Sequence, residues 1–108
     1  IKQGACDVLN LGFTMREFVK TAFLAEMAGI PIWHGSGIEL GIRDMSFIHA
    51  AVATRSCTVP SDTVCFLRQS DLLAKPFAVK DGYIEVPRRP GLGVELDEDA
   101  VRRFQVKT

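Results

Sequence analysis

The sequence of 108 residues lacks an excess of charge of either sign, because 13 Lys and Arg balance 13 Asp and Glu. This balance excludes the basic surface that a general nucleic-acid binder needs. The chain also lacks any apolar run that approaches the ~20 residues needed to span a bilayer. We therefore expect neither a nucleic acid nor a membrane as a partner. The apolar fraction of 47% is too high for a disordered segment.

Cysteine is scarce too, and the three cysteines, Cys6, Cys57 and Cys65, form no C-x-x-C pair. With two histidines in the whole chain, they do not make a zinc site, and an odd, sparse set argues against a disulfide scaffold. A reducing compartment is the better expectation, which places the protein in the cytoplasm. Residues 35–37, Gly-Ser-Gly, have neither the length nor the lysine of a phosphate-binding Walker loop.

The length of the chain suits one small domain but does not require a complete one. The chain begins Ile-Lys-Gln, without an initiator methionine and without the basic and apolar regions of a signal peptide. We expect it to start inside a larger protein and to carry no signal peptide.

Short apolar segments alternate with amphipathic stretches over the first two thirds of the chain. Expected strands cover residues 4–11, 30–33 and 63–67, and expected helices cover residues 14–28 and about 40–54. The strand–helix–strand–helix–strand order with short connections predicts parallel α/β units.

The first helix carries the clearest local signals. Thr14 followed three residues later by Glu17 is a capping box, and Gly29 is typical of the residue after a helix end. Its expected buried face holds apolar side chains at helical spacing, namely Met15, Phe18, Val19, Ala22, Phe23 and Met27. The second helix is expected to bury Ile42, Met45, Ile48, His49 and Val52, with His49 as a hydrogen-bonded core histidine.

The last third of the chain has a different pattern. Residues 77–86 predict a β-hairpin with Asp81 and Gly82 as its turn. Residues 87–93, PRRPGLG, predict a rigid crossing segment that is rich in turns. Residues 97–104 predict a short helix, because acidic side chains come first and Arg102 and Arg103 come last, as the helix dipole favours.

Parallel α/β units place functional side chains at the carboxyl ends of their strands. Those positions here are Asn10, residues 34–37 and the loop beside the third strand. His34 is either a general acid, base or hydrogen-bond donor, or a loop histidine bonded to a carbonyl. Asp62 is either an acid at the site or a turn residue, and Glu39 is either a site contact or the start of the second helix.

Three stretches together resemble the C-terminal end of enolase-superfamily enzymes of the mandelate racemase/muconate lactonizing type. They are GACDVLNL at 4–11, LAEMAGIPIWHGSGIELGI at 24–42 and DGYIEVPRRPGLGVELDEDAVRRF at 81–104. The last stretch is the most specific, because a D-G-x-I-x-V-P segment followed by PGLGVELDE resembles the ends of such chains. The resemblance covers nearly the whole chain.

The resemblance implies an α/β fold, namely the C-terminal part of a modified TIM barrel with a tail that returns to an α+β capping domain. Residues 4–11 then resemble strand six, residues 30–34 strand seven and residues 63–67 strand eight. Residues 1–76 would form the C-terminal portion of the barrel. Residues 77–108 would form the hairpin, crossover and short helix that pack on the capping domain.

Enzymes of this family abstract the proton α to a substrate carboxylate, with a Mg²⁺ ion that stabilises the enediolate and a Lys or His as base. The resemblance therefore implies an isomerase or lyase, such as a racemase, epimerase, cycloisomerase or dehydratase, that acts on a small-molecule carboxylate. The Mg²⁺ ligands would lie upstream of this segment, and none is expected within it. We expect the segment alone to be inactive and the complete enzyme to be a homo-oligomer.

Under this resemblance the expected catalytic residues are Asp62 and His34. Asp62 would be a hydrogen-bonding acid toward the enediolate. His34 stands one residue before the position that the racemase type fills with histidine. The expected substrate contacts are Asn10, Gly35 and Ser36, and no residue of the segment is expected to bind metal.

One position departs from the family pattern. The residue matched to the strand-six base is Gly12, which has no side chain to accept a proton. Either the enzyme works without that base, or residues are missing between Leu11 and Gly12. Two other hypotheses remain open: a catalytically inactive family member, and a non-catalytic α/β module whose strand-end loops bind a ligand or partner. Exposed strand edges would require such a module to dimerise or to dock on another chain.

Overall fold

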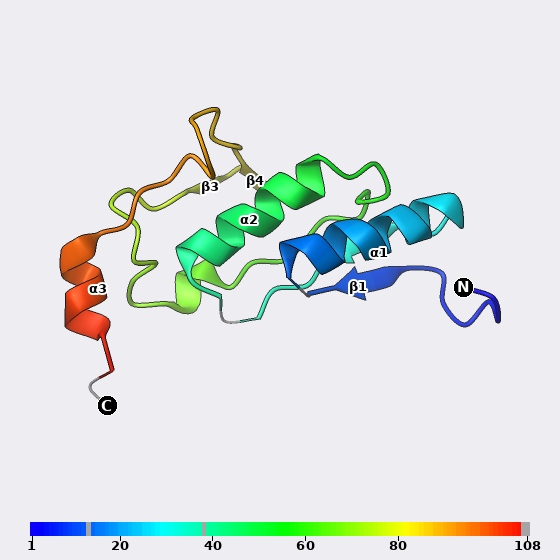
Figure 1. Cartoon of the computed structure of the whole chain (residues 1–108), viewed down its shortest axis with the longest axis horizontal. Helices are drawn as coiled ribbons and strands as arrows, with labels where there is room; N and C mark the ends of the chain where they lie inside the picture. Colours follow the sequence, from blue (N-terminus) through cyan, green and yellow to red (C-terminus); the bar gives the residue numbers. More distant parts are fainter. Residues whose placement is uncertain (13, 38, 107–108) are drawn as a thin grey trace.

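The computed structural model describes residues 1–12, 14–37 and 39–106. Strands β1 (Leu9–Leu11) and β2 (Ile32–His34) pair in parallel, and helices α1 (Met15–Met27) and α2 (Gly41–Val52) pack against one face of the pair (Figure 1). A 3₁₀ turn, η1 (Cys65–Leu67), follows, and then a hairpin of β3 (Val79–Lys80) and β4 (Tyr83–Ile84) and a final helix, α3 (Glu98–Phe104). The α/β character predicted from the sequence is confirmed for this part of the chain.

Helix α1 begins and ends where its local signals predict. The Thr14 side chain accepts a hydrogen bond from the Glu17 backbone, and the Glu17 carboxylate accepts one from the Thr14 backbone, so the capping box is confirmed. The chain leaves the helix through Ala28 and Gly29, and Gly29 has a φ of +68°, which favours glycine.

The buried face of α1 differs from the predicted one. Phe18, Ala22 and Ala25 are buried against the sheet and α2, and Phe18 is fully buried. The remaining apolar side chains that were expected in the core are exposed, namely Met15, Val19, Phe23 and Met27. The apolar surface of α1 is therefore wider than the stripe that the described residues cover, and hydropathy spacing alone does not show which part is covered.

Helix α2 also lies where predicted, and its buried face is partly the expected one. Met45 is fully buried as predicted and Ile48 is half-buried, whereas Ile42 and Val52 are exposed. Asp44, Phe47 and Ala50 are buried in addition, so the covered face is turned about the helix axis relative to the predicted one. Asp44 contacts Arg68, which lies 24 residues further along the chain. The spacing of apolar residues in a helix cannot predict a partner from another segment. His49 is confirmed as a half-buried, hydrogen-bonded histidine, since its Nε2 lies 3.1 Å from the Leu92 carbonyl oxygen.

The third predicted strand is wrong. Residues 65–67 form the 3₁₀ turn η1, and the side chains of Phe66 and Leu67 are exposed. The segment that lies beside β2 comes earlier, where Cys57 forms a parallel bridge with Ile32 and the Ile32 N–H donates to the Ser56 carbonyl at 2.7 Å. A short apolar run cannot be distinguished from a turn by its hydropathy, which is why residues 63–67 misled the prediction. The first strand is also shorter than the predicted residues 4–11.

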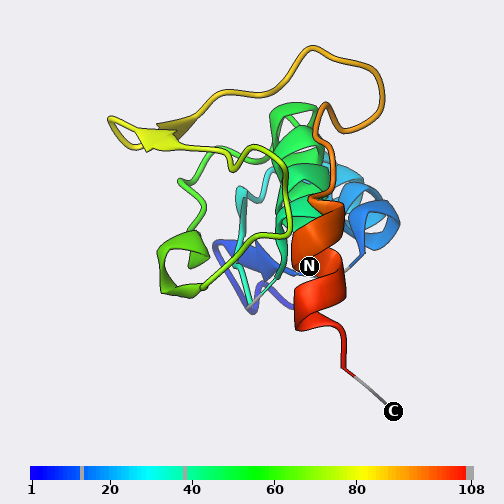
Figure 2. The ribbon, with the colours of Figure 1, turned by 90° about the vertical axis from the view of Figure 1, so that its left-hand side faces the viewer.

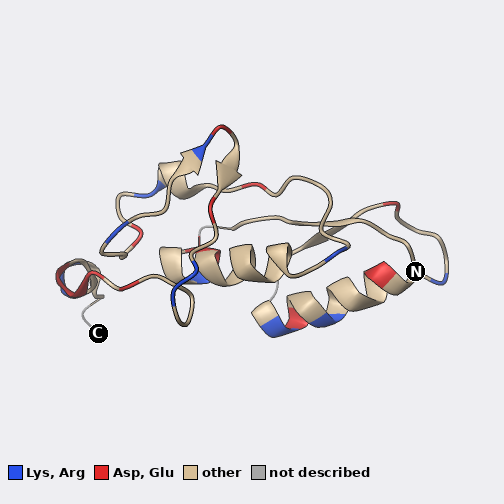
Figure 3. Cartoon of the chain, turned by 90° about the horizontal axis from the view of Figure 1, so that it is seen from above, with Lys and Arg blue, Asp and Glu red and all other residues tan. Residues whose placement is uncertain are grey.

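The tail has the predicted hairpin and helix. Asp81 and Gly82 both have positive φ angles, 52° and 81°, which is the type I′ turn that suits a two-residue hairpin loop. Asp97 caps the start of helix α3, because its carboxylate accepts hydrogen bonds from the backbone N–H groups of Asp99 and Ala100. Figure 2 shows this tail running along the outside of α2, with the hairpin extended away from the helices. Charged side chains of both signs are interspersed along α1 and the tail (Figure 3).

The assignment of strands to a closed barrel and the division of the chain after residue 76 stay predictions. Among the described residues, no helix is both long and apolar enough to cross a bilayer.

The start of α2 is held tightly against the loop that precedes the hairpin. The Gly41 N–H donates to the Asp71 carbonyl at 3.1 Å, and the side chain of Leu73 is buried beside it. A Cβ atom at position 41 would lie 2.5 Å from Leu73 Cδ1 and 2.9 Å from the Asp71 carbonyl oxygen. Only glycine fits at this position without a shift, because a side chain would clash with Leu73 and with the Asp71 carbonyl group.

We expect Gly41→Ala to lower the free energy of unfolding by about 1–3 kcal/mol, as overpacking does in a tightly packed site. Lys20→Ala, at an exposed position of α1, is the control and should change it by less than about 0.5 kcal/mol. Urea denaturation followed by circular dichroism measures both. Equal stability of the two variants would contradict the close packing at Gly41.

Candidate functional site

Strand β2 presents different residues on its two faces, because side chains alternate along a strand. Ile32 and His34 point toward the helices: Ile32 is fully buried in the core, and only 6% of His34 is exposed. Trp33 and Gly35 therefore lie on the opposite face, where the register places Asn10 beside Trp33. Of the expected site residues, His34 thus lies on the face that the helices cover, whereas Asn10 and Gly35 lie on the opposite, open face.

Asn10 and Gly35 meet on the open face of the sheet. A Cβ atom at Gly35 would overlap the side-chain amide of Asn10, so the absence of a side chain at position 35 makes room for that amide. Gly12, at the end of β1, is also close to this point, because a Cβ there would lie 3.1 Å from the Gly35 carbonyl oxygen. The structure therefore brings Asn10 and Gly35 together, as the strand-end argument predicts.

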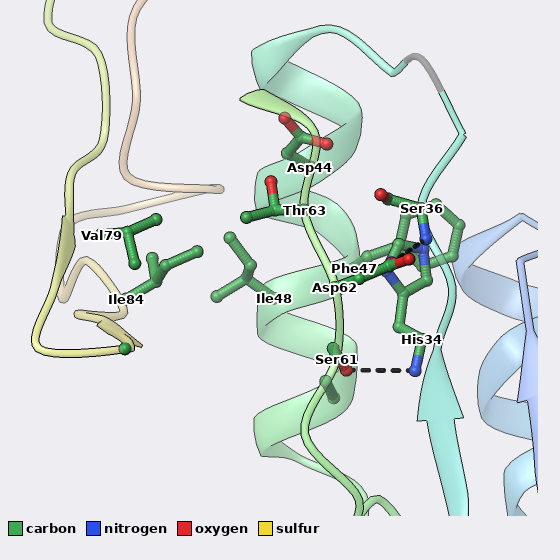
Figure 4. A pocket seen from close by; sticks show the side chains of 12 residues that line it. His34, Ser36, Asp44, Phe47, Ile48, Ser61, Asp62, Thr63, Val79 and Ile84 are labelled. Atoms are coloured by element: carbon green, nitrogen blue, oxygen red, sulfur yellow. Dashed lines mark hydrogen bonds between the residues drawn. The ribbon is translucent and has the colours of Figure 1, made fainter. Parts of the chain in front are cut away.

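Asp62 is attached to the carboxyl end of β2 through its side chain. Its Oδ1 accepts a hydrogen bond of 2.6 Å from the Ser36 backbone N–H, and the preceding Ser61 Oγ accepts one of 3.1 Å from the His34 N–H (Figure 4). None of the described residues donates a hydrogen bond to Asp62 Oδ2. Because Asp62 is exposed, that oxygen can hydrogen-bond to a ligand.

Ser36 contributes its backbone to this arrangement. Its hydroxyl oxygen is buried and has no hydrogen-bond partner among the described residues, and it lines a cavity together with His34. The substrate contact predicted for its hydroxyl stays a prediction, while the backbone N–H has an observed partner in Asp62.

The imidazole of His34 is packed in the layer between β2 and the helices. Its ring stacks on Phe47 with centroids 3.9 Å apart and meets the Phe18 ring edge-on at 6.1 Å. Burial lowers the pKa of His34, and the carboxylates of Glu39 and Asp62 partly oppose this effect. The ring is therefore neutral at neutral pH. Since it faces away from Asn10 and Gly35, the catalytic role expected for it stays a prediction.

Glu39 is a candidate that sequence reasoning set aside. Only 9% of it is exposed, its Oε1 lies 4.0 Å from the Arg43 guanidinium, and its Oε2 has no hydrogen-bond partner among the described residues. Arg43 in turn lies over the Phe47 ring, 5.6 Å from its centroid. The four-residue spacing of Glu39 and Arg43 indicates an ion pair, but nothing local in the sequence indicates that the carboxylate is buried.

A buried ion-pair cluster fixes the segment that follows Asp62. Arg68 lies 2.5 Å from Asp44 Oδ2 and 3.0 Å from Asp71 Oδ1, and about a tenth or less of each of the three side chains is exposed. Burial raises the pKa of Asp44, and the hydrogen bond from Arg68 works against that rise. The cluster ties the loop around η1 to α2, so it holds the chain on the C-terminal side of residues 61–63.

A cavity of about 170 Å³ lies behind β2, between α2, residues 61–63 and the hairpin. Figure 4 shows Ile48, Val79 and Ile84 on one side of it and the polar side chains of residues 61–63 on the other. No three His, Cys, Asp or Glu side chains come together as a metal site anywhere in the described ranges. The described residues therefore do not fit a Mg²⁺ site.

Comparison with known proteins gives a consistent result. The family model described as enolase C-terminal domain-like matches residues 1–100. Muconate cycloisomerase 1 of Pseudomonas putida is 32% identical over 90 residues, covering 82% of this chain and 24% of that protein. N-succinylamino acid racemase of Thermus thermophilus is 34% identical over 89 residues, covering 81% of this chain and 24% of that protein.

A crystal structure of an enolase from Mycobacterium smegmatis, in complex with formate and acetate, superposes with a TM-score of 0.87 at 29% identity. The superposition covers 95% of this chain and 26% of that one. The chain thus spans about a quarter of the length of each of these relatives.

We expect Arg68→Leu to lower the free energy of unfolding at pH 7 by about 3–5 kcal/mol, because it leaves two buried carboxylates without a positive partner. The loss should be smaller at acid pH, because burial raises the pKa of Asp44 and its protonated carboxyl group needs no positive partner. Arg89→Leu is the matched control, since Arg89 and Glu95 form an exposed pair worth less than about 1 kcal/mol. Urea denaturation at pH 7 and at pH 5 measures both variants, and equal losses would contradict the assigned role of Arg68.

Proposed function

This chain belongs to the enolase superfamily, as the C-terminal part of an enzyme of the mandelate racemase/muconate lactonizing type, and from that membership we propose a reaction. The complete protein would abstract the proton α to a carboxylate of a small substrate and pass through an enediolate. The Mg²⁺ ion that this family uses would be held by residues outside this chain. The relatives that are named for cycloisomerisation and racemisation support an isomerase activity, and a lyase activity remains part of the proposal.

The observation that best supports this proposal is the position of Asp62. Its carboxylate is fixed at the carboxyl end of β2 by the Ser36 N–H, and its Oδ2 remains open to a ligand. In our proposal Asp62 is in its protonated form when substrate is bound, and the O–H on Oδ2 donates a hydrogen bond to the enediolate oxygen as charge develops there. The fixed geometry means that little reorganisation is needed when the charge appears.

Asn10 would bind the substrate on the open face of the sheet. Its amide can donate to a carboxylate and also accept from a hydroxyl, which suits the recognition of a functionalised acid. Gly35 would support this role through the space that it leaves for the amide.

A catalytically inactive family member is the second candidate function. Gly12 supports it, because this position would supply the base at the end of strand six and carries no side chain.

The exposed apolar side chains of α1 support a further proposal, that this surface is covered in the assembled protein, which we expect to be a homo-oligomer.

Exchange of the substrate's α-proton in D₂O tests the reaction. The complete protein with Mg²⁺ should exchange the α-proton of at least one acid from a panel of N-succinylamino acids, as followed by ¹H NMR. Asp62→Asn should keep the Ser36 hydrogen bond, because the amide oxygen still accepts it, and should lower kcat by about 10²–10³-fold. Wild-type protein without exchange on the whole panel would favour the inactive candidate, and full activity of Asp62→Asn would exclude Asp62 from the chemistry.

Gly35→Ala should act through Asn10. The added methyl group displaces the Asn10 amide, so we expect KM to rise by about 10-fold with kcat changed by less than about threefold, as when binding common to ground and transition states is lost. Asn10→Ala should have a similar effect, and the double variant should be no worse than either single variant. Additive effects in this cycle would show that the two residues act independently.

A further inference from the structure

Three features surround His34 on the side of β2 that faces the helices. The imidazole is held by aromatic rings of α1 and α2, Phe18 and Phe47. The backbone N–H of the same residue holds Ser61, the neighbour of Asp62. Its Nε2 is buried and has no hydrogen-bond partner among the described residues. One residue therefore joins the helical layer to the segment that carries the proposed acid.

The charged groups that face His34 come from three parts of the chain. Glu39 belongs to the connection between β2 and α2, Arg43 to α2 itself, and Asp62 to the segment beside β2. Asp44 lines the same cavity but is already paired with Arg68. The two carboxylates, Glu39 and Asp62, favour a proton on the imidazole, whereas the aromatic packing, the burial and Arg43 oppose it.

We propose that His34 is a positioning residue, whose neutral imidazole, stacked on Phe47, fixes the carboxyl end of β2 and through it the placement of Asp62. The inference rests on the proposed function of Asp62. A protonated ring would be drawn toward the carboxylates of Glu39 and Asp62 and would compete with the Ser36 N–H for the latter. Asp62 would then move away from the enediolate, and activity would fall.

Proton access is available on this side of the strand. The cavity of about 170 Å³ is lined by His34 and Asp62 and is large enough for several water molecules. Because burial lowers the pKa of His34, protonation destabilises the folded arrangement as the pH falls below the ordinary range of histidine. At neutral pH and above, the ring is neutral and the site is in its active arrangement.

An NMR titration tests the geometry without any substrate. The Cε1 proton signal of His34 is identified in the complete protein by its loss in His34→Phe, and its pKa is then measured. Glu39→Gln and Asp62→Asn should each shift the titration to lower pH, and the shift should be larger for Glu39→Gln. Glu26→Gln, at an exposed position on α1, is the control and should leave the titration unchanged. A His34 pKa that responds to neither carboxylate would overturn the proposal.

A pH profile of kcat tests the positioning role. His34→Phe keeps an aromatic ring beside Phe47 and cannot be protonated, so it should retain kcat at pH 8 within about fivefold and lose the acid limb of the profile. His34→Ala removes the ring and should lower kcat at pH 8 by about 10–100-fold with little change in KM, as a displaced catalytic group does.

The outcomes separate positioning from chemistry and from the proposed function itself. A loss of 10²–10⁴-fold in His34→Phe at pH 8 is the size expected for a missing general acid or base, and it would overturn the positioning role. An acid limb that persists in His34→Phe would also overturn it. The His34 titration could respond to Glu39→Gln and Asp62→Asn in a protein that is inactive on every acid tested. That result would support the interaction between His34 and Asp62 and would contradict only the proposed reaction.

Discussion

Two backbone N–H groups at the carboxyl end of β2 organise this part of the molecule. The chain from Ser56 onward first pairs with Ile32 through the backbone, and it then continues along the strand through the side chains of Ser61 and Asp62. A regular ladder would have used carbonyl oxygens at these places. Using side chains instead lets the backbone turn outward, which leads it toward η1 and Arg68, while Asp62 remains at the strand end.

Local signals in the sequence were sufficient for elements whose interactions are local. The Thr14–Glu17 capping box defines the start of α1, and the Asp81–Gly82 pair defines the hairpin turn, because both depend on residues within a few positions of one another. The third strand could not be found in this way, since pairing beside Ile32 depends on which distant segment lies there. Residues 63–67 have the hydropathy of a strand, but no strand of the described part of the chain pairs with them.

The sequence predicted those site residues that lie at the carboxyl ends of the parallel strands. Asn10 and Gly35 meet at the carboxyl ends of β1 and β2, and Asp62 is attached to the end of β2 through the Ser36 N–H. The alternation of side chains separates His34 from Asn10 and Gly35 and places its ring in the cavity that Asp62 also lines. Burial of charge was not predictable, because Glu39 and Asp44 have the sequence context of ordinary helix starts. Their environment is created by side chains from other elements, above all Arg68 and Phe47.

The two hydrogen bonds at the end of β2 also constrain how this protein can change by mutation. Their donors are main-chain groups, so every amino acid except proline supplies them at positions 34 and 36. Their acceptors are side-chain oxygens, so positions 61 and 62 tolerate only residues with a short polar group. Substitution at positions 34 and 36 therefore keeps both hydrogen-bond donors, whereas a single nucleotide change at residue 61 or 62 is enough to remove an acceptor.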